Sequence, residues 1–221
     1  MNITFAGYEW TIKDSAGSLV GPGPNYFSNS CISVENDELT IQVINDSGNI
    51  LCGEVILTQS LGYGKYIFQL ASRVDLLANN LVLGIFTWSY SDTPNNSEVD
   101  IEFSKWNNET VTNSQYVVQP PSVENLHRFT TTLDEATINT THIIEWKPNE
   151  INFSSMYGCY LASPSELNII QSWTNTGASR PTPADESIHI NLWKYGIDPS
   201  LNIDPGQLTY ATIKGFYFYP Y

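Results

Sequence analysis

The sequence predicts an all-β protein built as a sandwich or a barrel. Short runs of alternating apolar and polar residues recur along the chain, and Gly, Pro, Asn and Asp separate them at regular spacing. The 3.6-residue periodicity of an amphipathic helix is nearly absent. This combination is typical of sheet proteins, because side chains on a strand alternate between the two faces. We expect a single domain over residues 1–221, since β sandwiches often reach this length.

The expected strands follow one another along the whole chain. We place them at 4–12, 30–34, 38–44, 51–58, 64–75, 80–89, 97–106, 113–119, 127–133, 141–147, 150–155, 187–195 and 208–219. The segment 80–89 holds an almost wholly apolar stretch, as expected for the central strand of a large sheet. We expect one helical turn at 164–170, with Ser163 as its cap, and a loop at 174–185.

Composition excludes several classes of partner. The chain has 9 basic and 23 acidic residues, a formal net charge of −14, which disfavours binding to nucleic acid or to an anionic membrane. No apolar run is long enough to span a bilayer. No signal peptide is visible, so an exported protein would have lost its leader. A neutral ligand such as a sugar polymer suits this charge.

The most informative stretch is 97–103, in which three carboxylates alternate with apolar residues. As a strand, it places Glu98, Asp100 and Glu102 on one face and the apolar side chains on the other. Neighbouring carboxylates repel, so the pKa of at least one of them must rise. An acidic solvent-exposed face is the plain interpretation. The alternative is a catalytic pair, because glycoside hydrolysis needs one ionised and one protonated carboxyl group.

These residues carry a family resemblance. The Glu-x-Asp-x-Glu run at 98–102 resembles the active-site strand of glycoside hydrolase family 16, in the unbulged form of bacterial lichenases and plant xyloglucan-modifying enzymes. The Cys-Gly-Glu-Val run at 52–55 and the Phe-Thr-Trp run at 86–88 resemble lichenase segments. The Glu-Trp-Lys-Pro run at 145–148 and the Asn-Leu-Trp triplet at 191–193 are similar to later family motifs.

The resemblance implies a fold and a set of roles. The fold is a concanavalin-like β-jelly-roll sandwich of two antiparallel sheets with a concave substrate cleft. Glu98 would be the nucleophile and Glu102 the acid/base, with Asp100 hydrogen-bonded to the nucleophile. The activity would be that of a retaining endo-β-glycosidase acting on a β-glucan or a related polysaccharide, without a required cofactor. The family also allows a structural calcium ion, whose ligands this sequence does not identify.

Other positions are candidates for binding sugar, each with a plainer alternative. Glu54 matches a lichenase sugar-binding Glu, although the Arg expected two residues later is Ile56; alternatively it faces solvent. Aromatic rings stack on sugar rings, but Phe86 and Trp88 also suit a sandwich core. The remaining candidates lie on one face of the expected strand 113–119, on one face of the expected strand 187–195, or in a turn: Asn113 and Gln115, then His189, Asn191 and Trp193, and finally Asn25. Asn25 also suits a turn, and Asn113 and Gln115 an ordinary wet edge. Asn96 replaces a lichenase Trp, which weakens the expectation of a mixed-linkage glucan.

Cysteine and histidine content bears on location and on metals. In lichenases a disulfide joins the Cys of the Cys-Gly-Glu run to an earlier Cys, so the resemblance implies a Cys31–Cys52 bond. Such a bond would indicate an oxidising, extracellular or cell-surface location. Three reduced buried thiols are the alternative, and Cys159 is left over. The three His residues have no close spacing, so no metal site is predicted.

The expected partner is a polysaccharide, and we expect a monomer. Two other functions remain open at this point. A transglycosylase would use the same residues with a sugar in place of water. A non-catalytic carbohydrate-binding protein could use the same sandwich, although three crowded acids bring no advantage to a lectin.

Overall fold

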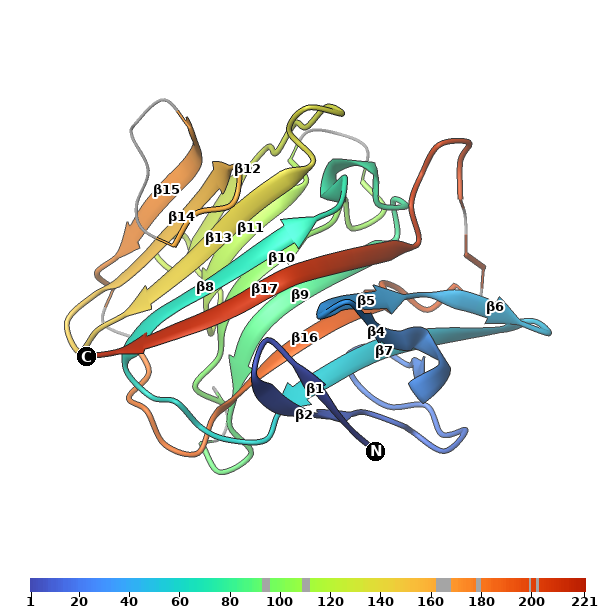
Figure 1. Cartoon of the computed structure of the whole chain (residues 1–221), viewed down its shortest axis with the longest axis horizontal. Helices are drawn as coiled ribbons and strands as arrows, with labels where there is room; N and C mark the ends of the chain where they lie inside the picture. Colours follow the sequence, from blue (N-terminus) through green and yellow to red (C-terminus); the bar gives the residue numbers. More distant parts are fainter. Residues whose placement is uncertain (93–95, 109–111, 162–167, 178–179, 199, 202) are drawn as a thin grey trace.

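The structure is a computed structural model that describes residues 1–92, 96–108, 112–161, 168–177, 180–198, 200–201 and 203–221. Two stacked β-sheets make up the described part (Figure 1). The strands pair antiparallel, apart from one short parallel pair between β3 and β7, described below. The predicted jelly-roll sandwich is therefore confirmed.

The larger sheet has ten strands and carries the predicted carboxylates. Its path runs in the order β1 (Asn2–Phe5), β2 (Tyr8–Ile12), β7 (Asn49–Leu57), β16 (Ser187–Lys194), β9 (Leu81–Trp88), β10 (Val99–Phe103), β11 (Ser114–Val118) and β12 (Leu126–Phe129). The short strands β3 (Tyr26–Phe27) and β6 (Ile44–Asp46) pair with β7.

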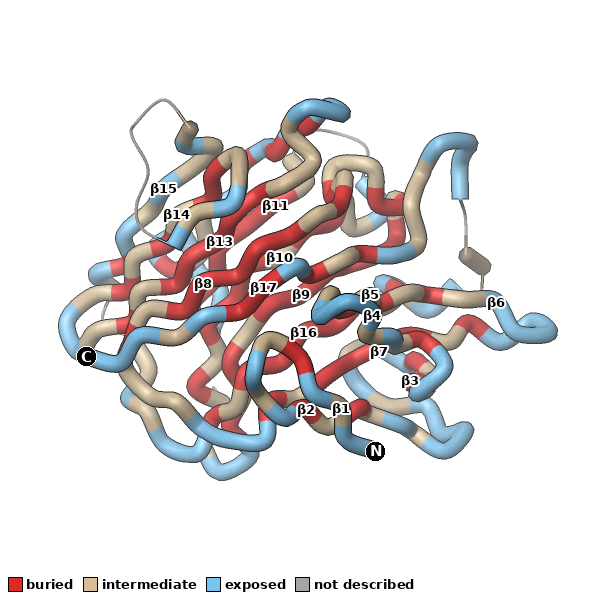
Figure 2. The backbone as a smooth tube through the Cα atoms, viewed as in Figure 1, coloured by how far each residue is buried: buried red, intermediate tan, exposed pale blue. Residues whose placement is uncertain are grey.

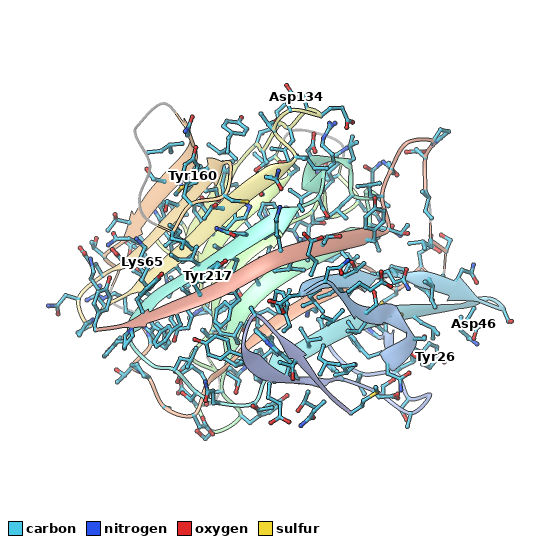
Figure 3. All side chains as sticks on the ribbon, in the orientation of Figure 1. Tyr26, Asp46, Lys65, Asp134, Tyr160 and Tyr217 are labelled. Carbon is cyan, nitrogen blue, oxygen red and sulfur yellow. The ribbon has the colours of Figure 1, made fainter. Side chains whose placement is uncertain are left out.

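The smaller sheet has seven strands and lies toward the viewer in Figure 1. Its order is β15 (Ile169–Asn175), β14 (Ile151–Tyr157), β13 (Asn139–Trp146), β8 (Gly64–Ala71), β17 (Tyr210–Pro220), β5 (Glu38–Gln42) and β4 (Ile32–Glu35). Two short 3-10 turns, η1 (Asn29–Cys31) and η2 (Val74–Leu76), complete the described elements. Ile67, Ile143 and Met156 of this sheet form a small apolar cluster separate from the main core. Tyr160, labelled in Figure 3, packs against it.

The core lies between the sheets, and the central strands are buried along most of their length (Figure 2). Side chains along each strand point alternately toward and away from this core. Val99, Ile101 and Phe103 of β10 are fully buried in the core, as their spacing predicts. Trp10 and Trp146 are the largest fully buried side chains, and both indole nitrogens donate to backbone carbonyls, of Phe5 at 3.1 Å and Pro181 at 3.2 Å.

Several strand predictions need correction. The segment 4–12 is a hairpin rather than one strand, because Ala6 and Gly7 adopt positive φ angles of 52° and 78° and turn the chain between β1 and β2. The expected strand at 97–106 is shorter and ends at Phe103. The predicted helical turn at 164–170 falls partly outside the described residues, and Ile169 already belongs to β15. That half-exposed edge strand extends to Asn175, inside the segment expected to be a loop.

Candidate active site

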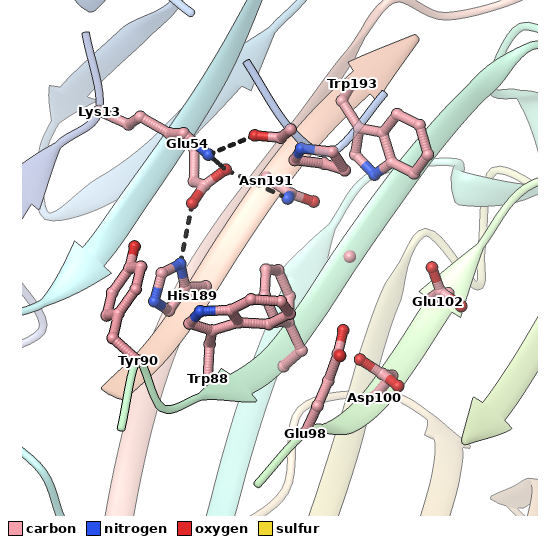
Figure 4. Close-up of a pocket in the computed structure, with 14 residues that line it drawn as sticks. Lys13, Glu54, Trp88, Tyr90, Glu98, Asp100, Glu102, His189, Asn191 and Trp193 are labelled. Carbon is pink, nitrogen blue, oxygen red and sulfur yellow. Dashed lines mark hydrogen bonds and ion pairs between the residues drawn. The ribbon is translucent and has the colours of Figure 1, made fainter. Parts of the chain in front are cut away.

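Strand β10 and the turn before it deliver the three carboxylates to one pocket. The turn places Asn96 and Ser97 at positive φ, 56° and 49°, directly before Glu98. The Thr87 hydroxyl donates to the Ser97 carbonyl at 2.6 Å and accepts from the Val99 amide at 3.0 Å. This buried bridge between β9 and β10 fixes the point at which the chain enters the sheet. Glu98, Asp100 and Glu102 then project away from the core into the pocket (Figure 4).

A row of paired residues runs across the sheet through Glu102. The register places Glu54 opposite Asn191, Asn191 opposite Gly84, and Gly84 opposite Glu102. The row continues from Glu102 to Gln115 and from Gln115 to Arg128. Paired residues on neighbouring strands share a face. The row therefore joins the carboxylates to polar side chains on both sides.

Gly84 allows the Asn191 side chain to approach the backbone closely in the middle of this row. A Cβ atom at residue 84 would lie 2.7 Å from Oδ1 of Asn191. Any larger residue would therefore displace Asn191 from its place beside Glu54. Because Gly84 has no side chain, nothing at this position projects into the pocket next to Glu102.

The electrostatics of the three carboxyl groups follow from burial and mutual repulsion. Burial raises the pKa of Glu98 to about 7, and the charge of Glu102 adds to the rise, while a hydrogen bond from Asp100 opposes it. Burial and the charges of both neighbours raise the pKa of Asp100 well above its ordinary value. Asp100 therefore keeps its proton and donates a hydrogen bond through it to Glu98. Burial also raises the pKa of Glu102, against a hydrogen bond from Gln115 and the charge of Arg128.

A second polar cluster closes one end of the pocket around Glu54. Lys13 forms an ion pair with Oε2 of Glu54 at 2.8 Å, and Nδ1 of His189 lies 2.8 Å from Oε1. The Asn191 amide donates to the same carboxylate at 3.4 Å. Burial opposes ionisation of Glu54, but the hydrogen bond from His189 and the charge of Lys13 lower its pKa overall. Glu54 is therefore an ionised, almost fully paired carboxylate.

Two polar atoms of this cluster remain without a partner among the described residues. They are Oδ1 of Asn191 and Nε2 of His189, and both are buried. Buried polar atoms in folded proteins are nearly always hydrogen-bonded, so each unsatisfied one calls for an explanation, of which a catalytic role or a bound molecule is one. Their position in the pocket is consistent with a ligand that carries hydroxyl groups.

Aromatic side chains line the pocket between the two polar clusters. Phe86 and Trp88 lie edge to face with ring centroids 6.5 Å apart, and Phe86 lies 5.0 Å from the His189 ring. Tyr90 continues the cluster 6.3 Å from Trp88, and Trp193 stands on the opposite side (Figure 4). The pocket encloses about 290 Å³. Apolar ring faces combined with a few polar groups are typical of small-molecule and sugar sites.

Most of the predicted site residues meet in this pocket. Its lining includes Glu54, Phe86, Trp88, Glu98, Asp100, Glu102, His189, Asn191 and Trp193. Gln115 lies next to it, where its amide donates to Oε2 of Glu102. Gln119, directly after the end of β11, donates to Oδ2 of Asp100 at 3.2 Å.

Two predicted residues lie elsewhere. The Asn25 amide is buried and donates to the carbonyls of Pro22 at 2.7 Å and Lys194 at 3.0 Å, so it holds the loop whose Gly21 and Pro22 line the pocket. Asn113 lines a separate hollow and donates to the Thr131 carbonyl at 2.8 Å.

Sequence reasoning missed five lining residues: Lys13, Gly21, Pro22, Gly84 and Tyr90. Gly84 carried a usable signal, because an isolated glycine inside a strand marks a close approach of other atoms. Lys13 and Tyr90 lie just beyond the ends of β2 and β9, outside any alternating pattern.

The predicted Cys31–Cys52 disulfide is wrong for this structure. Both cysteines are free and buried, whereas Cys159 is free and exposed. The Cys52 thiol donates to Oδ1 of Asn25 at 3.6 Å, and the Cys31 thiol is engaged by Ser30 and the backbone of Ile44. Burial raises the pKa of Cys31 to about 11 and that of Cys52 to about 12, which keeps both thiols protonated and unreactive.

Neither a metal-binding cluster nor a membrane-spanning helix occurs among the described residues. No group of three or more His, Cys, Asp or Glu side chains in the described ranges could hold a metal ion. Within those ranges, no helix has the length and apolar character needed to cross a bilayer.

Comparison with known proteins finds similarity in structure but not in sequence. No family model and no curated protein matches the chain. The β-glucanase of Bacillus licheniformis superposes with a TM-score of 0.68 at 20% identity, over 96% of this chain and 92% of that chain. A second similar structure is a Bacteroides ovatus family 16 enzyme of a mixed-linkage glucan locus, in complex with a G4G4G3G product. It superposes with a TM-score of 0.68 at 13% identity, over 95% of this chain and 94% of that chain.

A third similar structure carries a different description. A Mycobacterium tuberculosis protein described as an immunostimulatory antigen and pseudo β-1,3-glucanase superposes with a TM-score of 0.65 at 14% identity, over 96% of this chain and 91% of that chain. Similarity at these identities establishes the architecture. The chain therefore has the fold of the glycoside hydrolase family 16 structures over nearly its whole length.

Proposed function

We propose that this protein is a retaining endo-β-glycosidase that hydrolyses a neutral β-glucan. One observation carries the proposal. Three carboxyl groups with raised pKa values project from β10 and its preceding turn into one aromatic-lined pocket. A structural role does not explain this arrangement, because burying three repelling acids costs stability. Retaining glycosidases need such a pair, one carboxylate to attack and one carboxylic acid to donate a proton.

In the first step, the ionised carboxylate of Glu98 attacks the anomeric carbon. The glycosidic C–O bond breaks, and the proton of Glu102 moves to the leaving oxygen. Asp100 keeps its own proton in a hydrogen bond to Glu98, which stabilises the ionised nucleophile. In the second step, Glu102 takes a proton from water, the water oxygen bonds to the anomeric carbon, and Glu98 is released. Two inversions leave the configuration retained.

The rest of the pocket supports a neutral sugar polymer as substrate. Phe86, Trp88 and Trp193 offer ring faces for stacking, and the polar cluster around Glu54 offers acceptors for hydroxyl groups. The net charge of −14 disfavours a sulfated or acidic polymer. The structural neighbours include β-glucanases, which favours β-glucans among neutral polymers. Action on a polymer also favours a location outside the cell.

The test is reducing-sugar release from mixed-linkage glucan, laminarin, xyloglucan, agarose and carrageenan. Wild type is compared with Glu98→Gln and Glu102→Gln, which keep the size of the side chain but remove the charge. We expect activity on one neutral glucan and its loss in both variants. Full activity in Glu98→Gln would refute the assignment of the nucleophile.

A non-catalytic carbohydrate-binding protein is the second candidate. The pseudo β-1,3-glucanase among the structural neighbours favours keeping it, and so do the substitutions at Ile56 and Asn96. Retention on an immobilised polymer without any product would support it. A transglycosylase remains a variant of the first proposal, and transfer products in the presence of excess oligosaccharide acceptor would identify it.

A further inference from the structure

Gln115 lies between the proposed acid/base and a basic residue. Its Nε2 donates to Oε2 of Glu102, and its Oε1 accepts from Nε of Arg128 at 3.1 Å. The register supports this order, because Gln115 pairs with Glu102 on one side and with Arg128 on the other. The three residues thus form one chain of hydrogen bonds across β10, β11 and β12.

Arg128 decides which way the Gln115 amide faces. A glutamine amide has an acceptor end and a donor end, and it can turn to present either one. A guanidinium group is donor-only, so Arg128 can bind only Oε1 of Gln115. The amide group must then point its NH₂ at Glu102. Without Arg128, the amide is free to turn its oxygen toward a protonated Glu102.

The hydrogen bond from Gln115 to Oε2 of Glu102 determines which oxygen of Glu102 carries the proton. An oxygen that accepts a hydrogen bond from an NH₂ group does not itself carry a proton directed at that group. The acid form of Glu102 therefore carries its proton on Oε1, the oxygen that Gln115 leaves available to a substrate. A turned amide would accept this proton from the carboxyl group instead and hold it away from the substrate.

We propose that Arg128 is a positioning residue that acts through Gln115 to keep the transferable proton of Glu102 on Oε1. This inference rests on the proposed glycosidase function. Arg128 itself has an exposed side chain and need not touch the reacting atoms. Its charge and the Gln115 donor also favour the ionised form of Glu102, which the second step requires.

Trp106 holds Arg128 in place. The guanidinium carbon of Arg128 lies 5.3 Å from the centre of the Trp106 ring. Trp106 has a positive φ of 46°, a backbone conformation that side chains rarely adopt. The Ser104 hydroxyl accepts from the Trp106 amide at 2.8 Å and stabilises this turn. The stacked pair lies at the end of the row away from Glu54.

Leaving-group dependence tests the inference. The dinitrophenolate of a 2,4-dinitrophenyl glycoside leaves as a stable anion without protonation, whereas the sugar leaving group in the polymer needs a proton. We compare kcat and KM on both substrates for wild type, Arg128→Leu and Gln115→Met. Lys214→Leu is the matched control, because it removes one exposed positive charge from the other sheet. Circular dichroism and the thermal midpoint confirm folding.

The expected result is selective. Arg128→Leu and Gln115→Met lower kcat/KM on the polymer by about tenfold or more, whereas Arg128→Leu leaves kcat/KM on the dinitrophenyl glycoside nearly unchanged, because kcat/KM reports the first step and that leaving group needs no proton. Combining them adds little, since both break the same chain of hydrogen bonds. Equal losses on both substrates, or wild-type kinetics on both, would overturn the inference. A wild type inactive on every substrate would instead refute the proposed function.

Discussion

Replacing Glu98 with glutamine is expected to stabilise the protein at alkaline pH. Burial is the main reason that the pKa of Glu98 rises from 4.5 to about 7 in the folded protein. Between these two values the folded state binds more protons than the unfolded state, so stability falls as the pH rises through this window. Below pH 4.5 the carboxyl is protonated in both states and resembles the neutral amide of glutamine.

The size of the effect follows from the same numbers. A pKa rise from 4.5 to about 7 corresponds to about 3 kcal/mol of stability lost on ionisation. For a chain of this length, that is roughly 6–12 °C in the thermal midpoint. At pH 8 the thermal midpoint of Glu98→Gln should therefore exceed that of wild type by about this amount. At pH 4 the two midpoints should be nearly equal.

The assay is thermal and urea unfolding of wild type and Glu98→Gln at both pH values. Glu124→Gln is the matched control. Glu124 is exposed, so its substitution should have the same small effect on the free energy of unfolding at pH 4 and at pH 8. A difference between wild type and Glu98→Gln that is the same at pH 4 and pH 8 would refute the reasoning. It would mean that Glu98 titrates normally and that the pocket does not strain its charge.

Three further predictions concern the rest of the pocket. Gly84→Ala should raise KM severalfold, because its Cβ would lie 2.7 Å from Oδ1 of Asn191; unchanged kinetics would contradict this. Lys13→Met should lower the free energy of unfolding by about 2 kcal/mol in urea titrations at neutral pH, since it removes the cation paired with buried Glu54; unchanged stability would exclude a structural role for the pair. Trp193→Ala should weaken oligosaccharide binding in calorimetry by about 1–3 kcal/mol, and intact affinity would mean that its ring does not stack on sugar.

The predictable part of the site follows from local alternation. Residues 98–103 and 187–195 have a period of two, and this period alone assigns their side chains to opposite faces of a strand. The structure places Glu98, Asp100 and Glu102 in the pocket and Val99 and Ile101 in the core.

The unpredicted part depends on contacts between distant segments. Lys13 is 41 residues from its partner Glu54, and no periodicity connects them. Asn25 is 169 residues from Lys194, whose carbonyl binds its amide. Strand β15 has a half-exposed sequence whose period is weak, so its pairing with β14 decides its structure.

Trapping the glycosyl-enzyme tests the central claim most directly. Wild type is incubated with an activated 2-deoxy-2-fluoro β-glycoside of an oligosaccharide that it hydrolyses, and the adduct is located by peptide mass spectrometry. We predict one covalent glycosyl group on Glu98 in wild type and none in Glu98→Gln. An adduct on another residue would contradict the assigned nucleophile, and hydrolysis with inversion and without any adduct would contradict the retaining mechanism.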